Sequence, residues 1–298
     1  MRLAHGLDIN HPVHKAMVEL GKRLEEKSNG QLIVKLYPSG QLGAERECLE
    51  LLQIGSLDIT KVSAAVLENF VSDYKVLSIP YLFRDRQHSY DFYDSTIGKD
   101  LLHKGGDYRL MGLCYYDAGS RSFYTKTKAI GSPDDLEGLK IRVQKSHMAV
   151  AMVNQLGGAP TPISWGELYT ALQQGVVDGA ENNLPSFFTS KHYEVCKYYS
   201  FDEHTAVPDI LLIGTERWSR LNERERQWLQ EAADESAIIQ RELWRKAEEE
   251  ALKTIKKAGV KVNYPDKHPF SEKTRAIMNM FKGDSIAQKL IRNIKSMN

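Results

Sequence analysis

One long amphipathic segment near the C-terminus limits what this chain can fold into. Asn222, with Glu225 three residues later, forms a capping-box pattern that is typical of a helix start. The apolar face that follows consists of Ile239, Leu243, Ala247, Ala251 and Ile255 and ends near Gly259. A helix of roughly 36 residues measures about 54 Å, which is longer than a small domain. Because the apolar step is four, we expect one helix over about 223–258 that crosses two lobes, rather than a coiled coil.

Helical and strand-like patterns alternate along the rest of the chain. Helices are expected from Pro12 to a stop at Gly30, and at about 44–54, 148–156 and 165–174, with a helix start at 132–136. Strands are expected at about 32–37, 57–62, 110–116, 122–125 and 139–144, and a short polar strand or a turn at 178–183. This alternation predicts an α/β fold.

Composition excludes several classes of protein. The 298 residues are 42% hydrophobic and 27% charged, as in ordinary globular proteins, and at ~150 residues per domain they form one large domain or two lobes. The 40 basic and 39 acidic residues leave a net charge of +1, so we expect no nucleic-acid partner. No apolar run approaches the ~18–20 residues that would cross a bilayer.

Residues with metal-binding or nucleophilic chemistry are sparse. Cys48, Cys114 and Cys196 stand far apart, and we expect them to be free and buried. His11 and His14 share a helical spacing, but they have no third ligand nearby. The motifs GxGxxG, GxxxxGK[ST], HExxH and GxSxG are all absent. We therefore expect no metal, no cofactor and no catalytic residues.

The remaining candidates are polar and aromatic residues at strand ends and turns. Arg121 and Arg142 carry planar guanidinium forks that match a carboxylate. Asn182 and Asn183 can donate to and accept from sugar hydroxyls, and the indole of Trp165 suits the apolar face of a ring. A solvent-facing strand arginine and an asparagine turn before a proline are the alternative interpretations. From the residues alone, the pattern indicates a site for a small anion.

Five stretches occur in an order that covers almost the whole chain. They are YPSGQLG at 37–43, GSLDIT at 55–60, IPYLF at 79–83, DLEGLKIR at 135–142 and ELYTALQQGVVDG at 167–179. Together they resemble the extracytoplasmic solute-binding proteins of tripartite ATP-independent periplasmic (TRAP) transporters, the DctP-type family. The resemblance implies a two-lobed periplasmic-binding-protein-like fold with crossing strands and one long helix spanning both lobes. We expect residues 1–119 plus about 209–247 in the first lobe, and 120–208 plus about 248–298 in the second.

The resemblance also implies roles for individual residues. Arg142 matches the family's arginine that pairs with the ligand carboxylate, and Arg121 matches a second arginine. Trp165 matches the aromatic residue that contacts the ligand ring, and Asn182 matches a ligand-binding asparagine.

Two departures and one doublet refine the expected ligand. His5 stands where many members have asparagine, and Ser63 stands where sialic-acid binders have glutamate, which argues against sialic acid. Asn182 and Asn183, followed by LPSF, resemble the subgroup that binds sugar acids, and Asp209 is placed to meet hydroxyls.

The expected function is capture of a sugar acid, such as D-glucuronate, D-galacturonate or a related keto-sugar acid such as diketogulonate, for delivery to the TRAP membrane permease. The expected protein is a periplasmic monomer without enzymatic activity. The N-terminus has no apolar signal-peptide core, which fits either a cytosolic protein or a mature form with the signal removed. Because family members carry a signal sequence, the resemblance implies that it has been removed. The alternative is a periplasmic sensor domain or an enzyme that acts on a small carboxylate on a similar two-lobed frame.

Overall fold

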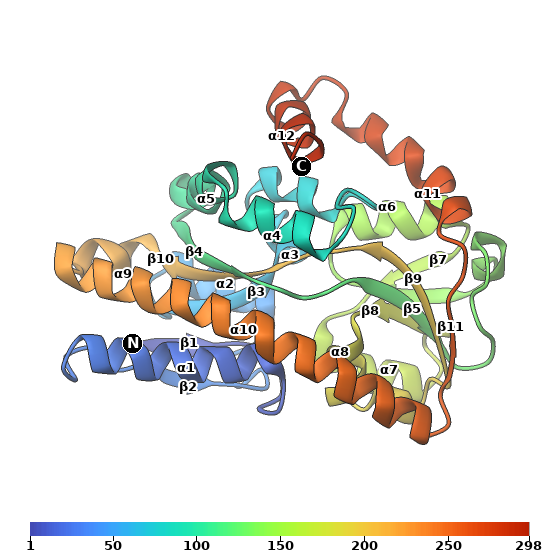
Figure 1. Ribbon diagram of the computed structural model, residues 1–298, viewed down its shortest axis with the longest axis horizontal. Coiled ribbons are helices and arrows are strands. Elements are labelled where there is room, and N and C mark those ends of the chain that lie inside the picture. The colour runs from blue at the N-terminus through green and yellow to red at the C-terminus, as the bar shows by residue number, and fades with distance from the viewer. Residues whose placement is uncertain (298) are drawn as a thin grey trace.

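Two β-sheets occupy the two halves of the long axis of the computed structural model, which describes residues 1–297 (Figure 1). The first sheet has the order β2-β1-β3-β10-β4 and the second has the order β11-β9-β5-β8-β6-β7. The strands of the first sheet are β1 (Arg2–Ala4), β2 (Lys35–Tyr37), β3 (Ile59–Ser63), β4 (Leu110–Tyr116) and β10 (Asp209–Gly214). Those of the second are β5 (Arg121–Thr125), β6 (Lys140–Val143), β7 (Ala159–Pro162), β8 (Gly179–Asn182), β9 (Tyr198–Thr205) and β11 (Lys261–Asn263).

Both sheets are mixed, as expected when helices and strands alternate but some strands return directly. In the first sheet β1 pairs parallel to β2 and β3, whereas β10 pairs antiparallel to β3 and β4. In the second sheet β6 is parallel to β7 and β8, β11 is parallel to β9, and β5 is antiparallel to β8 and β9. The predicted α/β class is confirmed.

The chain crosses between the sheets where long strands meet end to end. It passes from β4 to β5 through residues 117–120, and from β9 to β10 through residues 206–208. These adjacent crossings join the two halves of the molecule (Figure 1). Such short connections between two packed bodies are typical of a hinge.

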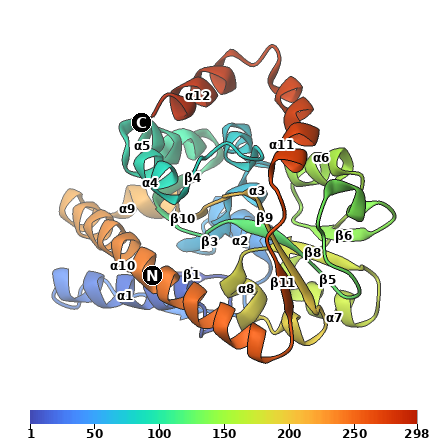
Figure 2. The same cartoon turned by 45° about the vertical axis from the view of Figure 1, so that its right-hand side comes forward.

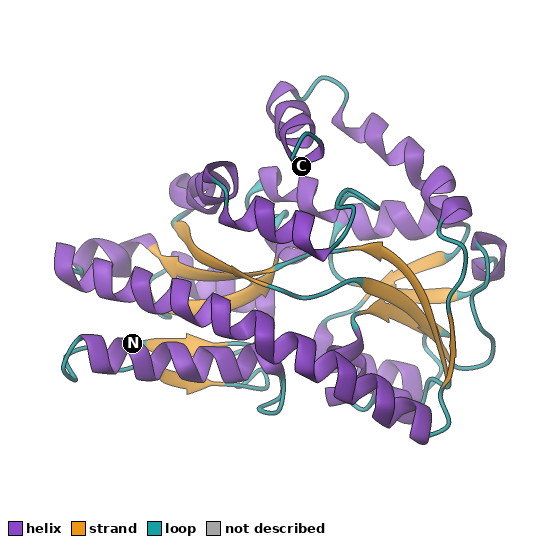
Figure 3. Ribbon diagram, in the orientation of Figure 1, coloured by secondary structure: helices purple, strands orange, loops and turns teal. Residues whose placement is uncertain are grey.

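Helices cover the outer faces of the sheets, as the colouring by secondary structure shows (Figure 3). The α-helices other than the longest are α1 (Pro12–Lys27), α2 (Glu45–Gln53), α3 (Ala64–Leu67), α4 (Arg86–Asp94), α5 (Thr96–Leu102), α6 (His147–Leu156), α7 (Leu168–Gln173), α8 (Leu184–Thr189), α9 (Thr215–Arg220), α11 (His268–Thr274) and α12 (Ser285–Lys295). The 3₁₀ helices are η1 (Ser72–Ser78), η2 (His103–Tyr108), η3 (Pro133–Leu136), η4 (Trp165–Glu167), η5 (His192–Glu194) and η6 (Arg275–Phe281).

The long helix α10 (Glu223–Lys257) has 35 residues and confirms the prediction. Its capping box is formed, because the side chain of Asn222 accepts from the N–H of Glu225 and the side chain of Glu225 accepts from the N–H of Asn222. Figures 1 and 2 show that α10 runs past both sheets, with α1 beside its first half. It packs against α1 and β4 there, and against α8 further along.

The buried face of α10 differs from the predicted one. Ile239, Leu243 and Ala247 are only half-buried, and Ala251 and Ile255 alone of the predicted stripe are buried. The reason is that the helix packs on several elements in turn, and at the crossing between the sheets it meets polar backbone. There the Gln240 side chain donates to the carbonyl of Asp117 at 2.7 Å and accepts from its N–H at 2.8 Å.

The C-terminal segment returns toward the first sheet. α12 packs against η1, and Lys75 of η1 pairs with Asp284 at 2.8 Å. His88 of α4 lies 2.8 Å from the carbonyl of Ile294 in α12. This placement puts the end of residues 248–298, expected with the second lobe, on helices of the first half of the chain.

Two further observations concern the described part of the chain, residues 1–297. The three cysteines are free and buried, as predicted. In that part, no helix is long and apolar enough to cross a membrane.

Candidate functional site

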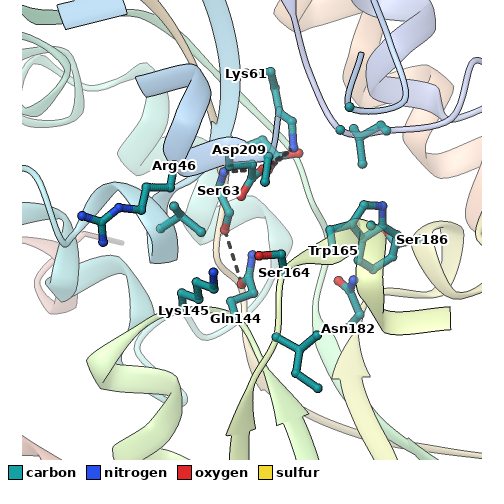
Figure 4. A pocket seen from close by; sticks show the side chains of 18 of the residues that line it. Arg46, Lys61, Ser63, Gln144, Lys145, Ser164, Trp165, Asn182, Ser186 and Asp209 are labelled. Carbon is teal, nitrogen blue, oxygen red and sulfur yellow. Dashed lines mark hydrogen bonds and ion pairs between the residues drawn. The ribbon is translucent and has the colours of Figure 1, made fainter. Parts of the chain in front are cut away.

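A cavity of about 450 Å³ lies between the two sheets, within the range of ~300–1,000 Å³ typical of small-molecule sites. Its lining comes from both halves of the molecule, and Figure 4 shows the side chains converging on it. Of the predicted site residues, all but His5 line this cavity: Arg142, Arg121, Asn182, Trp165, Asn183, Ser63 and Asp209. Residues far apart in the sequence therefore meet in one place.

Arg142 on β6 is a buried guanidinium with no acidic partner. It is 2% exposed, and its Nε donates to the carbonyl of Ile163 at 2.8 Å. Its buried Nη1 has no hydrogen-bond acceptor within residues 1–297. Burial lowers the pKa of Arg142, because water is removed and no carboxylate replaces it. An arginine in this condition is suited to receive an anion from outside the protein.

Arg121 on β5 lines the same cavity but is already paired. Its Nε and Nη2 donate to the carboxylate of Glu181 at 2.5 and 2.8 Å, and Nη2 also donates to the Glu181 carbonyl at 2.8 Å. Its Nη1 donates to Oδ1 of Asn182 at 2.8 Å. Of the five N–H groups of a guanidinium, one therefore remains for a ligand.

The group around Glu181 is a buried ion network behind the cavity wall. Although burial opposes ionisation, the charge of Arg121 holds the pKa of Glu181 at about 2. His204 lies 3.4 Å from Glu181 and 2.7 Å from Asp202. Burial also opposes the His204 charge, but Asp202 raises its pKa to about 9. This network holds Arg121 in place and accounts for its charge.

The remaining candidates on the second sheet offer a donor and an apolar surface. Oδ1 of Asn182 accepts from Arg121 and from the N–H of Asn183, so its Nδ2 is the group left to donate. Oδ1 of Asn183 caps α8 by accepting from the N–H of Ser186 at 2.8 Å. The Trp165 ring, at the start of η4, lies 5.9 Å from the Arg142 guanidinium. The indole thus lies next to the anion-binding position.

His5 is placed beside the cavity but does not line it. Its ring is 1% exposed, with Nε2 3.0 Å from Nδ1 of His14 and Nδ1 accepting from the N–H of Leu7 at 3.1 Å. Burial lowers the pKa of His5 to about 3, so the ring is neutral. Both ring nitrogens are used inside the protein, and the neighbours Gly6 and Leu7 line the cavity instead.

The sequence analysis missed several polar residues that line the cavity, among them Glu45, Lys61 and Gln144. Lys61 on β3 is 3% exposed and lies between Glu45 at 3.0 Å and Asp209 at 3.1 Å. Gln144, just after β6, accepts a hydrogen bond from Ser63 at 3.4 Å, which links the two halves of the molecule. A lysine in the middle of the strand Ile59–Ser63 was the available signal, since a fully buried lysine needs a partner.

His11 and His14, whose helical spacing could have suggested a metal site, contact different residues. His14 faces His5, whereas Nε2 of His11 lies 3.1 Å from the hydroxyl of Ser186. Within residues 1–297, no three His, Cys, Asp or Glu side chains gather in a way that could hold a metal ion.

Two sheets joined by short crossings, with a cavity between them that presents one unpaired guanidinium, define a solute-binding protein. Residues 3–284 match the family model of the bacterial extracellular solute-binding protein, family 7 (DctP). The chain belongs to this family, whose members are the binding proteins of TRAP transporters. It is 36% identical to a solute-binding protein of Chromohalobacter salexigens over 273 residues, 91% of this chain and 81% of the relative.

Solved structures agree with this assignment. A TRAP periplasmic solute-binding protein from Bradyrhizobium sp. BTAi1, in complex with α/β-D-galacturonate, has a TM-score of 0.97 and 38% identity, and the match covers 100% of this chain and 99% of that one. A TRAP solute-binding protein from Chromohalobacter salexigens, with bound D-glucuronate, has a TM-score of 0.96 and 34% identity, covering 99% and 98%. The sialic acid-binding protein SiaP of Vibrio cholerae is 30% identical over 93% of this chain and 86% of its own length.

Proposed function

We propose that this protein captures a uronate such as D-glucuronate or D-galacturonate, or a related keto-sugar acid, outside the cytoplasm and delivers it to the membrane subunits of a TRAP transporter. The solved structures with TM-scores of 0.97 and 0.96 carry D-galacturonate and D-glucuronate, which supports this ligand class. The protein works as a monomer that binds and releases its ligand without chemical change.

One observation carries the proposal: Arg142 is buried against the cavity without an acidic partner. A carboxylate accepts two parallel hydrogen bonds from a guanidinium, and such charge-assisted bonds are among the strongest in proteins. A ligand carboxylate therefore compensates the burial of this charge, which no carboxylate within residues 1–297 pairs with.

The rest of the cavity suits the hydroxyls and ring of a sugar. Asn182 has an amide donor to offer, and Asp209 and Ser63 offer oxygen atoms from the opposite side. The Trp165 face lies beside Arg142, where the apolar face of a sugar ring can pack against it. These groups favour a polyhydroxylated acid over a plain dicarboxylate, because buried polar groups left without partners cost ~1–3 kcal/mol each.

Calorimetric titration of the purified protein tests the proposal. D-glucuronate or D-galacturonate should bind at least about a hundredfold more tightly than succinate or malate, a difference of ~2.7 kcal/mol. Equal affinity for succinate would remove the sugar-acid assignment and leave the family assignment alone.

Binding should close the protein around its ligand. We propose as the moving bodies the two lobes expected from the sequence, 1–119 plus about 209–247 and 120–208 plus about 248–298, with α12 at the end of the second lobe lying on η1 and α4 of the first. Contacts such as His11–Ser186 and Ser63–Gln144 bridge the cavity and support the closed form. A ligand that touches both sides favours closure only through its higher affinity for the closed state. Small-angle scattering should show a smaller radius of gyration with saturating uronate; identical curves would contradict closure.

A further inference from the structure

The side of the cavity opposite Arg142 contains two carboxylates that share one lysine. Lys61 lies 3.0 Å from Oε1 of Glu45. It also lies 3.1 Å from Oδ1 of Asp209 (Figure 4). The three side chains come from α2, β3 and β10, all on the side of the first sheet. We refer to Glu45, Lys61 and Asp209 as the acidic triad.

Each carboxylate of the acidic triad keeps one oxygen free. Oε1 of Glu45 accepts from both Lys61 and the N–H of Ser63, whereas its Oε2 has no partner within residues 1–297. Oδ1 of Asp209 accepts from Lys61, and its Oδ2 likewise has no partner in that range. Both residues line the cavity. An ionised carboxylate oxygen only accepts hydrogen bonds, so these two atoms can each accept a hydrogen bond from a ligand hydroxyl.

The formal charges make the cavity asymmetric. Two carboxylates and one ammonium leave the acidic triad with one negative charge, while Arg142 provides one unpaired positive charge on the other side. Lys61 is 3% exposed and Asp209 is 7% exposed, so water screens these charges only weakly. A ligand with an anionic head and a neutral hydroxylated tail fits this polarity in one orientation.

We propose that the acidic triad selects ligands by charge: it accepts the hydroxylated tail of a sugar acid with one carboxylate and repels a second carboxylate on that tail. This selection rests on the proposed function and adds a residue-level reason why aldaric acids, with a carboxylate at each end, are excluded. Like charges brought together in a desolvated site disfavour the wrong partner more strongly than a missing contact does.

Two exposed cations at the rim of the cavity are the competing position for a second carboxylate. Nε of Arg46 donates to Glu50 at 3.0 Å, and the Arg46 side chain points away from the Lys61–Asp209 pair (Figure 4). Lys145 is exposed, so water and salt screen its charge. Arg46 and Lys145 are therefore placed to attract an anionic ligand as it approaches the cavity, and not to hold a second carboxylate in the bound state.

D-Gluconate and D-glucarate provide the matched ligand pair. Both are open six-carbon chains with the same four inner hydroxyls, and they differ only in whether the far end is a hydroxymethyl group or a carboxylate. Titration calorimetry on the intact protein should give D-gluconate at least about a hundredfold tighter binding than D-glucarate. D-Glucuronate and D-galacturonate are measured in parallel.

Two variants test the assignment to the acidic triad. Asp209→Asn and Glu45→Gln each remove one negative charge with little change of shape. Each should reduce the ratio of D-gluconate affinity to D-glucarate affinity about tenfold or more. Glu26→Gln is the matched control, since it makes the same change at an exposed position of α1 outside the cavity lining. Thermal unfolding of each variant confirms that it folds; if Asp209→Asn does not, Glu45→Gln and the wild-type ratio decide.

The outcomes separate two failures. If neither uronate binds, the proposed function itself is wrong. If the uronates bind but D-glucarate binds as tightly as D-gluconate, or the ratio of the two affinities is unchanged in both folded variants, charge selection is overturned and the proposed function remains.

If the wild-type protein binds neither open-chain acid, the variants decide. Gain of D-glucarate binding in either variant supports charge selection, and no gain in both variants overturns it. D-Glucarate binding that disappears in Lys145→Ala would assign the second carboxylate to the rim and also overturn it.

Discussion

Two regions of the cavity wall each bury an arginine, and they differ in what surrounds it. Around Arg121, the Glu181 carboxylate takes both Nε and Nη2, and Glu181 is itself next to His204. Around Arg142, the guanidinium Nε donates to the Ile163 carbonyl, which carries no full charge. Burial acts against both charges, yet Glu181 raises the pKa of Arg121 while the pKa of Arg142 is lowered.

This difference separates a guanidinium that holds the fold from one that serves the ligand. A buried charge with a protein partner is already compensated and adds order to the wall of the cavity. A buried charge without a protein partner can be compensated by the opposite charge of a bound ligand. The histidines near the two arginines also differ in pKa. In the Arg121 region the pKa of His204 is raised to about 9. In the Arg142 region burial, and to a smaller extent the Arg142 charge, lower the pKa of His192 to about 3.

The largest expected effect is on stability, in the Arg121 region. Arg121→Ala leaves the Glu181 carboxylate buried without its main partner, and breaking a buried ion pair in this way costs ~3–5 kcal/mol. Urea unfolding followed by circular dichroism should show this loss. Arg142→Ala is the matched control, because the same truncation leaves no acid unpaired. Equal stability of the two variants would remove the distinction between the regions.

The next effect is on binding, in the Arg142 region. Arg142→Ala should weaken uronate affinity at least about a hundredfold, because two charge-assisted hydrogen bonds are lost at ~1.5–3 kcal/mol each. Isothermal titration calorimetry measures the loss directly. Affinity within threefold of wild type in a folded Arg142→Ala variant would show that the carboxylate binds elsewhere.

The histidines predict opposite pH dependence of stability in the two regions. Between pH 3 and 6.5 the folded state binds fewer protons at His192 than the unfolded state, so its contribution is lost as the pH falls below 6.5, by about 2 kcal/mol at pH 5. His204 has a raised pKa, so its contribution is complete below about 6.5 and is lost as the pH rises through about 9. Titration of the ring signals by NMR should find His192 neutral at pH 5 and His204 charged at pH 8.

Substitution of each histidine separates the two contributions. His192→Gln should reduce the destabilisation at pH 5, and His204→Gln should reduce the loss above pH 8, each relative to wild-type melting curves. A His192 ring that titrates near 6.5 would contradict the assigned burial effect.

The smallest effect tests the geometry of the Arg142 fork. Arg142→Lys keeps the charge but cannot present two parallel donors, so it should recover only part of the affinity lost in Arg142→Ala and remain about tenfold weaker than wild type. Full recovery would mean that charge alone, and not the bidentate geometry, holds the carboxylate.

Local sequence was sufficient for the elements that form from their own residues. The helix Glu223–Lys257 was predicted because its capping box lies within four residues and its length follows from an unbroken helical pattern. Its buried face was not predicted correctly, since Gln240 is buried by a backbone segment more than a hundred residues earlier, at Asp117.

The candidate site shows the same division between residue type and residue partner. Arg121, Arg142 and Asn182 were predicted because their chemistry suits a small hydroxylated anion, and Asp209 was predicted from the family resemblance; all four line the cavity. Nothing local distinguishes Arg121 from Arg142: the distinction depends on Glu181, which is 60 positions from Arg121.

The acidic triad was decided by tertiary structure alone. Lys61 meets Glu45 from 16 positions away and Asp209 from 148 positions away, so no sequence pattern connects the three. By itself the sequence indicated the long helix, several of the other helices and strands, and the types of polar residue, because those depend on neighbours along the chain. Packing between the sheets decided which charges are paired and which are left for the ligand. It also decided that His5 contacts His14 and does not line the cavity. The reason is that a charge or a ring nitrogen is satisfied by whichever partner folding brings within hydrogen-bond distance.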